Sequence, residues 1–288
     1  MHIGIGAGVL KHEAHLTEDL LASPAAFLTF GSYTLLEREG NKDPTYYFDE
    51  VTQTSYNAIG LKNPGAAVAA DMIPAMSKHI HKAGKRFRLS LAPTAPGHLR
   101  RMIQQVSMTP LRTFVDQYEF NAACPNHSEG KQLHEVLSRD PKALRGLLEE
   151  TKGFALEPKQ KALKIAPDTD EEMLRRSVDL CVEFGIGSIV SGNTRKVQTP
   201  VVGGKPMISV PFCGQGGMVL LEAGVKQIKL LAKICEKRKA PIKLIACGGI
   251  FMGEHARRYE DAGAHEAQIV TAFIEYRAKI FQDILVAM

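Results

Sequence analysis

The sequence alternates short apolar runs with longer stretches of helical period, and this alternation limits its fold more than any other feature. Eight of the runs have the length and composition of strands. Strands that alternate with helices pair in parallel through right-handed crossovers. Eight such units with no polar linker predict an α/β fold, a closed (β/α)8 TIM barrel, rather than an open doubly wound sheet. The predicted strands are Ile3–Val9, Ala25–Phe30, Phe87–Ala92, Val115–Asn121, Ala162–Ala166, Ser188–Ser191, Ile242–Cys247 and Glu266–Val270.

Helical patterns fill the intervals between these runs. In one of them Thr169 is the expected N-cap, because the acidic residues that follow it suit the positive end of a helix dipole. The chain has 288 residues, and one barrel takes about 250, so we predict a single domain over residues 1–288. The predicted helices are Ala66–Ala83, Gly97–Val106, Pro141–Lys152, Thr169–Glu183, Glu222–Arg238, Gly253–Ala262 and Glu275–Ala287.

Three of the predicted connections that follow strands are unusually long. They are Gly31–Gly65, Cys124–Pro141 and Gly192–Gly216, after the second, fourth and sixth strands. Connections of this kind usually have about two to six residues. In a barrel all of them gather at the carboxyl ends of the strands, where active sites lie. We therefore predict a functional site on that face.

Composition narrows the class of protein. The five cysteines have no C-x-x-C spacing, which argues against a disulfide framework or a zinc site and for a reducing cytoplasm. The amino-terminal residues lack the pattern of a signal peptide, and no run approaches the roughly 18 apolar residues of a membrane span. His12-Glu13-Ala14-His15 is one residue short of H-E-x-x-H, so we predict no metal site.

The formal charge is +5, and the densest basic cluster is Lys82, Lys85, Arg86 and Arg88. No aromatic residues interleave with these charges, as they would in a single-stranded nucleic-acid site. We expect a solvated face here and no nucleic-acid partner.

Turn residues mark two candidate phosphate contacts. Gly248-Gly249 ends the seventh strand and Thr271 ends the eighth, each before a helix. Loops at these strands often hold phosphate in barrels, because backbone N–H groups and the helix dipole attract anions. Ordinary turns are the alternative.

Polar side chains gather at the fourth, fifth and sixth strand ends. Cys124 is the first residue of a long loop and has Asn121 and Asn126 on either side of it in the sequence. Asn193-Thr194 follows the sixth strand. The amides could read the edge of a heterocycle or an imide, or could simply hold the loop through local backbone bonds. Lys164 lies within the fifth strand, where an unpaired ammonium would be costly to bury, so we expect it to face the site.

Together these segments resemble the dihydroorotate dehydrogenase family, and the soluble class 1 branch in particular. The resemblance runs from near residue 6 to the carboxyl terminus, with the motifs in order at the correct strands. They are Thr34-Leu-Leu-Glu-Arg38-Glu-Gly40-Asn41, Asn57-Ala-Ile-Gly60-Leu61-Lys-Asn63-Pro-Gly65, Asn121-Ala-Ala-Cys124-Pro-Asn126, Lys164-Ile-Ala-Pro, Ser191-Gly-Asn193-Thr194, Gly216-Gly217 and Gly248-Gly249-Ile250.

The resemblance implies an FMN-dependent oxidation of dihydroorotate in pyrimidine biosynthesis. Cys124 would be the active-site base, which points to class 1, because class 2 uses serine there. Class 1 enzymes pass electrons to fumarate or to a separate flavoprotein subunit, and a homodimer is expected. Substrate binding would fall to Asn57, Asn121, Asn126, Asn193 and Thr194, and cofactor binding to Ala7, Gly8, Lys164, Gly217, Gly248, Gly249 and Thr271.

Two positions depart from the family pattern, and the second is Val270, which precedes Thr271 where the family has a glycine. The first, Phe30, bears on the substrate. It stands where class 1 enzymes usually carry a lysine, and Gly31-Ser-Tyr-Thr34 looks more like class 2. Either another cation replaces this lysine, or the substrate is another dihydropyrimidine, an imide or an enone. A flavin-binding module without turnover is a further alternative.

Overall fold

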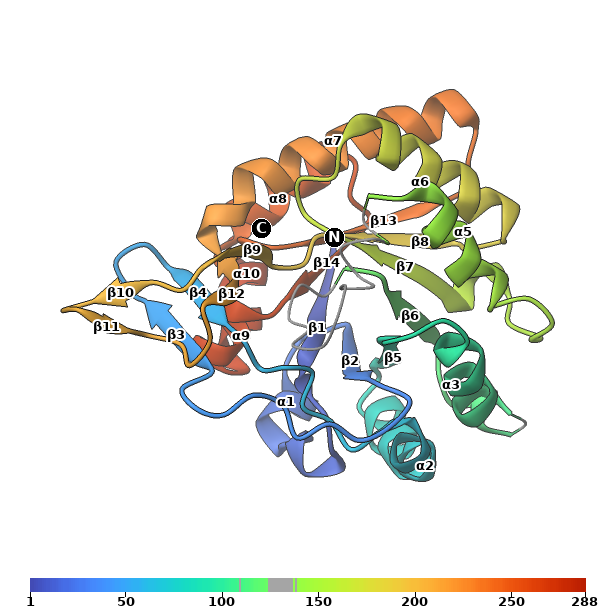
Figure 1. Ribbon diagram of the computed structural model, residues 1–288, viewed down its shortest axis with the longest axis horizontal. Helices are drawn as coiled ribbons and strands as arrows, with labels where there is room; N and C mark the ends of the chain where they lie inside the picture. Colours follow the sequence, from blue (N-terminus) through green and yellow to red (C-terminus); the bar gives the residue numbers. More distant parts are fainter. Residues whose placement is uncertain (109, 124–136, 138) are drawn as a thin grey trace.

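Eight parallel strands close into a barrel in the computed structural model, which describes residues 1–108, 110–123, 137 and 139–288 (Figure 1). Around the barrel their order is β1-β2-β5-β6-β7-β8-β13-β14, and β14 pairs with β1. This confirms the predicted (β/α)8 fold, and each predicted strand overlaps one barrel strand. The barrel strands are β1 (His2–Leu10), β2 (Phe27–Tyr33), β5 (Arg86–Leu91), β6 (Gln117–Asn121), β7 (Lys161–Ile165), β8 (Ser188–Ser191), β13 (Lys243–Cys247) and β14 (Glu266–Ile269).

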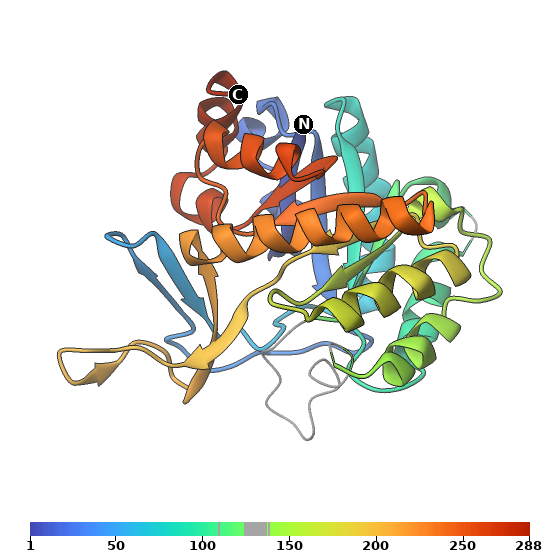
Figure 2. The same cartoon turned by 90° about the horizontal axis from the view of Figure 1, so that it is seen from above.

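Helices surround the barrel (Figures 1 and 2). In the part of the chain that the structure describes, every helix is too short or too polar to cross a membrane. The α-helices are α1 (Glu18–Ala22), α2 (Ala66–Lys82), α3 (His98–Ser107), α5 (Pro141–Glu149), α6 (Glu171–Glu183), α7 (Leu221–Arg238), α8 (Gly253–Asp261), α9 (Thr271–Tyr276) and α10 (Lys279–Val286). The 3-10 helices are η1 (Glu13–His15), η2 (Leu111–Thr113), η3 (Pro158–Gln160) and η4 (Met218–Leu220).

Two helix predictions were wrong in detail. The N-cap of α6 is Asp170, whose carboxylate accepts from the N–H of Met173, whereas Thr169 donates its hydroxyl to the carbonyl of Ala166. The helix expected over Glu275–Ala287 is divided between α9 and α10, because the left-handed backbone of Arg277 ends α9.

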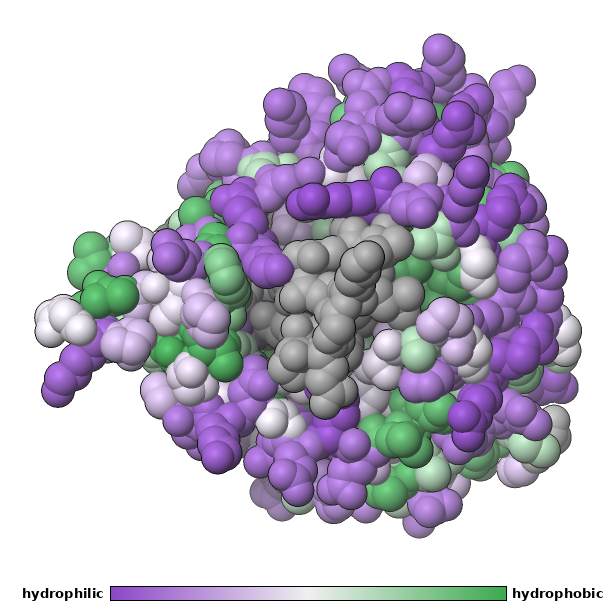
Figure 3. All heavy atoms as spheres, in the orientation of Figure 1, coloured by the Kyte–Doolittle hydropathy of each residue, from purple (hydrophilic) through white to green (hydrophobic). Residues whose placement is uncertain are grey.

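The long connections after β2 and β8 contain a second sheet, which lies beside the barrel mouth (Figures 1 and 2). The sequence predicted these connections as long loops and did not predict the sheet. This antiparallel sheet has the order β3-β4-β12-β9. A hairpin of β10 and β11 projects from it, and Figure 3 shows apolar side chains there, among them the exposed Val201 and Val202. The bounds are β3 (Tyr46–Asp49), β4 (Thr54–Asn57), β9 (Arg195–Gln198), β10 (Val201–Val202), β11 (Lys205–Pro206) and β12 (Phe212–Gly217).

Polar side chains fill much of the barrel interior. Side chains alternate along a strand, so one face of β5 points inward with Arg88 while the other packs against the helices. Arg88 forms an ion pair with Glu266 and lies 3.5 Å from the centre of the Phe27 ring. Lys85 is also buried and donates to the carbonyl of Ala25 at 3.1 Å. The prediction that this basic cluster is a solvated face was therefore wrong for these two residues.

Candidate active site

A cavity of about 320 Å³ opens at the carboxyl ends of the barrel strands, against the second sheet. Its size is within the range of small-molecule sites. Every predicted site residue that the structure describes lines it, whereas Cys124 and Asn126 lie outside the described residues. These lining residues are Ala7, Gly8, Asn57, Asn121, Lys164, Asn193, Thr194, Gly217, Gly248, Gly249 and Thr271.

A chain of amide hydrogen bonds builds one wall of the cavity. Asn121, at the end of β6, donates its Nδ2 to Ser32 Oγ at 2.9 Å and accepts the backbone N–H of Ala123 at its Oδ1. Asn193 donates its Nδ2 to the same Oδ1 at 3.3 Å and accepts the N–H of Thr194 at 2.8 Å. Both amides are thus held in defined orientations on the cavity wall.

Lys164 lines the cavity from the carboxyl-terminal half of β7, as its position in the sequence predicted. Its ammonium donates to Gln268 Oε1 at 3.3 Å and lies 3.7 Å from Glu119 Oε1. The side chains of Lys164 and Glu119 are 3% and 1% exposed. A buried carboxylate therefore compensates the charge of Lys164 from behind the cavity lining.

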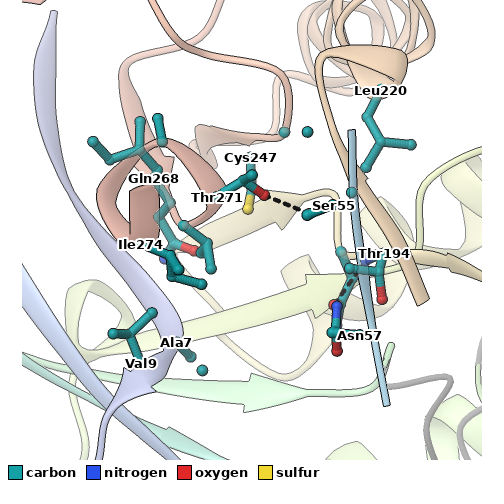
Figure 4. Close-up of a pocket in the computed structure, with 18 of the residues that line it drawn as sticks. Ala7, Val9, Ser55, Asn57, Thr194, Leu220, Cys247, Gln268, Thr271 and Ile274 are labelled. Atoms are coloured by element: carbon teal, nitrogen blue, oxygen red, sulfur yellow. Dashed lines mark hydrogen bonds between the residues drawn. The ribbon is translucent and has the colours of Figure 1, made fainter. Parts of the chain in front are cut away.

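Two hydroxyl side chains of the cavity lining face each other, as Figure 4 shows for Ser55 and Thr271. Ser55 of β4 and Thr271 at the start of α9 are joined by a hydrogen bond of 2.8 Å between their hydroxyls. Nearby, the Tyr46 hydroxyl donates to Glu275 at 2.6 Å. Sequence reasoning identified Thr271 but not Ser55 or Tyr46, because the second sheet that brings β3 and β4 to the cavity was not expected.

Glycines let the backbone itself form part of the wall. A Cβ added to Gly8 would meet no protein atom within 4 Å, so this face of β1 borders open space. Gly249 has a φ of +73°, and a Cβ there would approach the backbone N of Leu221 to 2.7 Å. The helices that begin at the cavity lining, η4 and α9, have no side-chain cap. Their first N–H groups could therefore serve an anion.

Lys11 also lines the cavity and was not predicted. It follows β1 directly, and its ammonium donates to the carbonyl of Ser32 at 3.1 Å. Its place after the first strand was the available signal, because that position belongs to the same face as the predicted site.

Phe30 does not face the cavity. It is fully buried in the apolar cluster that also contains Ile73 and Met76 of α2, and its ring contacts that of Phe87 at 5.7 Å in an edge-to-face arrangement. Phe30 packs against the helices, whereas Ser32 lines the cavity, because the register of β2 shifts between Phe30 and Tyr33. Phe30 is therefore no guide to the charge of the ligand.

The charged side chains among the described lining residues are basic. They are Lys11 and Lys164, and the carboxylate of Glu119 lies behind the described lining, 3.7 Å from the Lys164 ammonium. Cys247 also lines the cavity, but burial raises the pKa of its thiol. This shift favours the neutral thiol form of Cys247.

Comparison with known proteins gives a consistent picture. A family model described as dihydroorotate dehydrogenase matches residues 2–288. A protein of Chloroflexus aurantiacus named dihydroorotate dehydrogenase (quinone) is 24% identical over 302 residues, which cover 95% of this chain and 75% of the relative. One of Trichodesmium erythraeum with the same name is 27% identical over 272 residues, with 90% and 68% covered. Both names specify quinone, which differs from the acceptors expected for class 1.

Solved structures show the same fold. The ligand-free DHODH of Eimeria tenella superposes with a TM-score of 0.81 at 19% identity, over 99% of this chain and 82% of the other. The same protein in complex with ferulenol gives a TM-score of 0.77 at 18% identity, over 99% and 79%.

Proposed function

This chain belongs to the dihydroorotate dehydrogenase family of oxidoreductases, and from that premise we propose that its cavity binds FMN together with a dihydroorotate-like ring. The observation that carries the substrate is the make-up of the cavity wall. Amides of Asn57, Asn121 and Asn193 and the ammonium of Lys11 gather there, without a carboxylate among the described lining residues. An anionic ring with imide-like edges complements such a wall, because amides supply both donors and acceptors.

Lys11 is the proposed partner of the substrate carboxylate. Its ammonium lies beside Ser32, which in turn contacts Asn121. A charge-assisted hydrogen bond at this place would fix the ring against the amides. In this proposal Lys11 supplies the cation that Phe30 does not, which favours dihydroorotate over another dihydropyrimidine, an imide or an enone.

The residues present fit a flavin. Gly8 offers a backbone surface open to the cavity, against which a planar ring could pack. Gly217, Gly248, Gly249 and Thr271 lie at the end where uncapped N–H groups could hold a phosphate. Enzymes of this family are flavoproteins, and we propose FMN with Lys164 near the pyrimidine edge of its ring, where an ammonium stabilises negative charge.

The protein's own part in the chemistry is proton transfer and orientation. Cys124 is the proposed base, on the strength of its motif, and would take the proton from the ring carbon beside the carbonyl. The bound flavin would accept the hydride from the neighbouring carbon. The amides and Lys11 would hold the ring in place, which lowers the entropic cost of reaching the reactive geometry.

Cysteine at position 124 favours a class 1 type of base, whereas the named relatives use quinone. We propose a quinone as the first electron acceptor to test, ahead of fumarate or a separate flavoprotein subunit. After anaerobic reduction, the rate of flavin reoxidation by a soluble quinone should exceed that by fumarate. The reverse order would support the fumarate-using branch.

The proposed function is tested by anaerobic titration of the flavin-loaded protein with dihydroorotate. Loss of the oxidised flavin absorbance is the expected result. Binding of the ring without that loss would point instead to a module that holds flavin without turnover. An unchanged spectrum, with no sign of binding, would reject dihydroorotate as the substrate.

A further inference from the structure

A continuous hydrogen-bonded chain links the amide wall of the cavity to a carboxylate buried inside the barrel. Ser90 of β5 donates its hydroxyl to Glu119 Oε1 at 2.8 Å, and the hydroxyls of Ser32 and Ser90 lie 2.8 Å apart. Asn121 then donates to Ser32 at 2.9 Å. The amide wall is therefore connected, group by group, to Glu119.

The direction of every donor in this chain is determined. A hydroxyl has one proton, and that of Ser90 goes to Glu119, so Ser32 must donate to Ser90. Ser32 can then only accept from Asn121. The backbone N–H of Ala123 independently requires an oxygen on the other side of the Asn121 amide, at 3.1 Å. Both ends of the amide thus demand the same orientation.

The same logic extends to the neighbouring amides. Asn193 accepts the N–H of Thr194, so its Nδ2 must face Asn121. On the other side, Gln268 accepts from Lys164 at its Oε1 and donates its Nε2 to Glu119 Oε2 at 2.7 Å. Glu119 is 1% exposed, and its two oxygens accept the hydrogen bonds from Ser90 and from Gln268.

We propose that Glu119 is a positioning residue that sets the donor and acceptor pattern of the cavity amides. Its carboxylate can only accept, and through Ser90 and Ser32 it requires the same orientation of the Asn121 amide as the backbone N–H of Ala123 does. Asn121 in turn accepts from Asn193. Each of the two amides then has one Nδ2 proton outside the chain, which suits carbonyl or carboxylate oxygens of a ring. The inference rests on the proposed function for the identity of that ring.

The Glu119→Gln variant should break the pattern, whichever way its new amide turns. If the amide oxygen accepts from Ser90, the amide nitrogen meets the Nε2 of Gln268, and two donors face each other. If the amide at position 119 turns round, its nitrogen donates to Ser90, and Ser90 must then donate to Ser32. Ser32 in turn would have to donate towards Asn121, whose nitrogen already donates to Ser32. An unmet buried polar group is costly in either case.

The double variant Glu119→Gln with Gln268→Glu should restore the pattern. The two side chains face each other, so the exchange keeps one carboxylate and one amide at the same place. The new carboxylate accepts from Lys164 and from the amide at position 119, and Ser90 again has an acceptor. Ser90→Ala cuts the chain with the charge intact. Ser177→Ala is the matched control, because Ser177 is a buried serine whose hydroxyl makes no hydrogen bond in the described structure.

The first readout needs neither flavin nor substrate. In the full chain labelled with 15N-asparagine, the side-chain amide resonances of Asn121 and Asn193 should shift in the Glu119→Gln and Ser90→Ala variants. They should return in the double variant and stay in place in Ser177→Ala. Unchanged resonances in Glu119→Gln would overturn the inference. If Glu119→Gln does not fold, the resonances of Ser90→Ala decide the question.

The second readout is orotate binding, followed through the absorbance of the bound flavin. We expect Glu119→Gln to weaken binding at least about tenfold, equivalent to about 1.4 kcal/mol, and the double variant to recover most of this loss. No recovery in the double variant, or no loss in Glu119→Gln, would contradict the inference. If the parent protein binds no orotate, the proposed function fails, and the resonances still decide the role of Glu119.

Discussion

Phe30 faces the helices, whereas Lys11 lines the cavity. These two positions determine which residue could pair with a negatively charged ligand. In the linear sequence Phe30 occupies the place of an expected lysine. Its position in β2 turns its ring away from the cavity, and the end of β1 brings an ammonium in from another element. The charge required for an anionic substrate is thus present at a different residue.

Replacement of Lys11 by alanine should weaken orotate binding. A hydrogen bond to a charged group contributes about 1.5–3 kcal/mol, so we expect roughly a tenfold to hundredfold loss of affinity, with flavin content unchanged. The matched control is Lys62→Ala, since Lys62 is exposed and lies outside the cavity lining. Equal orotate affinity in Lys11→Ala and the parent would show that the carboxylate lies elsewhere.

Replacement of Cys124 by alanine should separate binding from chemistry. Loss of a general base slows a reaction by about 10²–10⁴, so flavin reduction by dihydroorotate should slow at least about a hundredfold, while FMN stays bound. Cys235→Ala, in α7 and away from the cavity, serves as the control. Near-parental reduction in Cys124→Ala, measured by stopped-flow absorbance, would mean that another group is the base.

At the scale of elements, the barrel strands could be predicted because their patterns are local. In β5, for example, Phe87 and Leu89 face the helices, and Arg88 and Ser90 face inward. The same alternation indicates that Arg88 points into the barrel. The prediction of a solvated face missed this, because it treated Arg88 as part of an exposed basic cluster. The second sheet could not be predicted in this way, because β4 and β12 are short, glycine-rich or polar, and pair across more than 150 residues.

The turn after β13 gives a prediction at this scale. Gly249→Ala should destabilise the fold and reduce flavin content, because a Cβ there would lie 2.7 Å from the backbone N of Leu221. Gly84→Ala is the control: Gly84 has a similar φ of +71° but no atom within 4 Å of an added Cβ. Backbone strain alone costs roughly 1 kcal/mol, so Gly84→Ala should lose that much stability and keep its flavin. Equal flavin content in the two variants would argue against a cofactor role for this turn.

At the scale of the whole molecule, the interior of the barrel contains charged side chains as well as apolar ones. Arg88 of β5 pairs with Glu266 of β14 across the interior, and Arg86 adds a second contact to Glu266 at 2.6 Å. Burial by itself would raise the pKa of Glu266, but the two guanidinium groups lower it below its ordinary value. This ion pair therefore couples the stability of the barrel to pH.

The sign of that coupling follows from the lowered pKa. A carboxyl with a lower pKa in the folded protein stabilises it above its ordinary pKa, and the contribution is lost as the pH falls through the lower value. Glu266→Gln should cost about 3–5 kcal/mol at pH 7, because it leaves Arg88 buried without its partner, and should flatten the loss of stability below the ordinary value of 4.5. Denaturant unfolding at pH 7 and pH 4 measures both effects.

The exposed pair of Arg145 and Glu183 provides the comparison for that measurement. Exposed ion pairs add little to stability, so Glu183→Gln should leave both the unfolding free energy and its pH dependence nearly unchanged. A Glu266→Gln variant that behaved like Glu183→Gln would show that the interior pair does not stabilise the barrel.

We propose that one cavity at the barrel mouth both holds a flavin and oxidises a dihydroorotate-like ring. The most direct test of this proposal is anaerobic mixing of the flavin-loaded protein with dihydroorotate, with flavin absorbance and orotate measured in the same sample. We expect loss of the oxidised flavin absorbance and one orotate formed for each flavin reduced. Retention of that absorbance, with no orotate formed, would contradict the proposal.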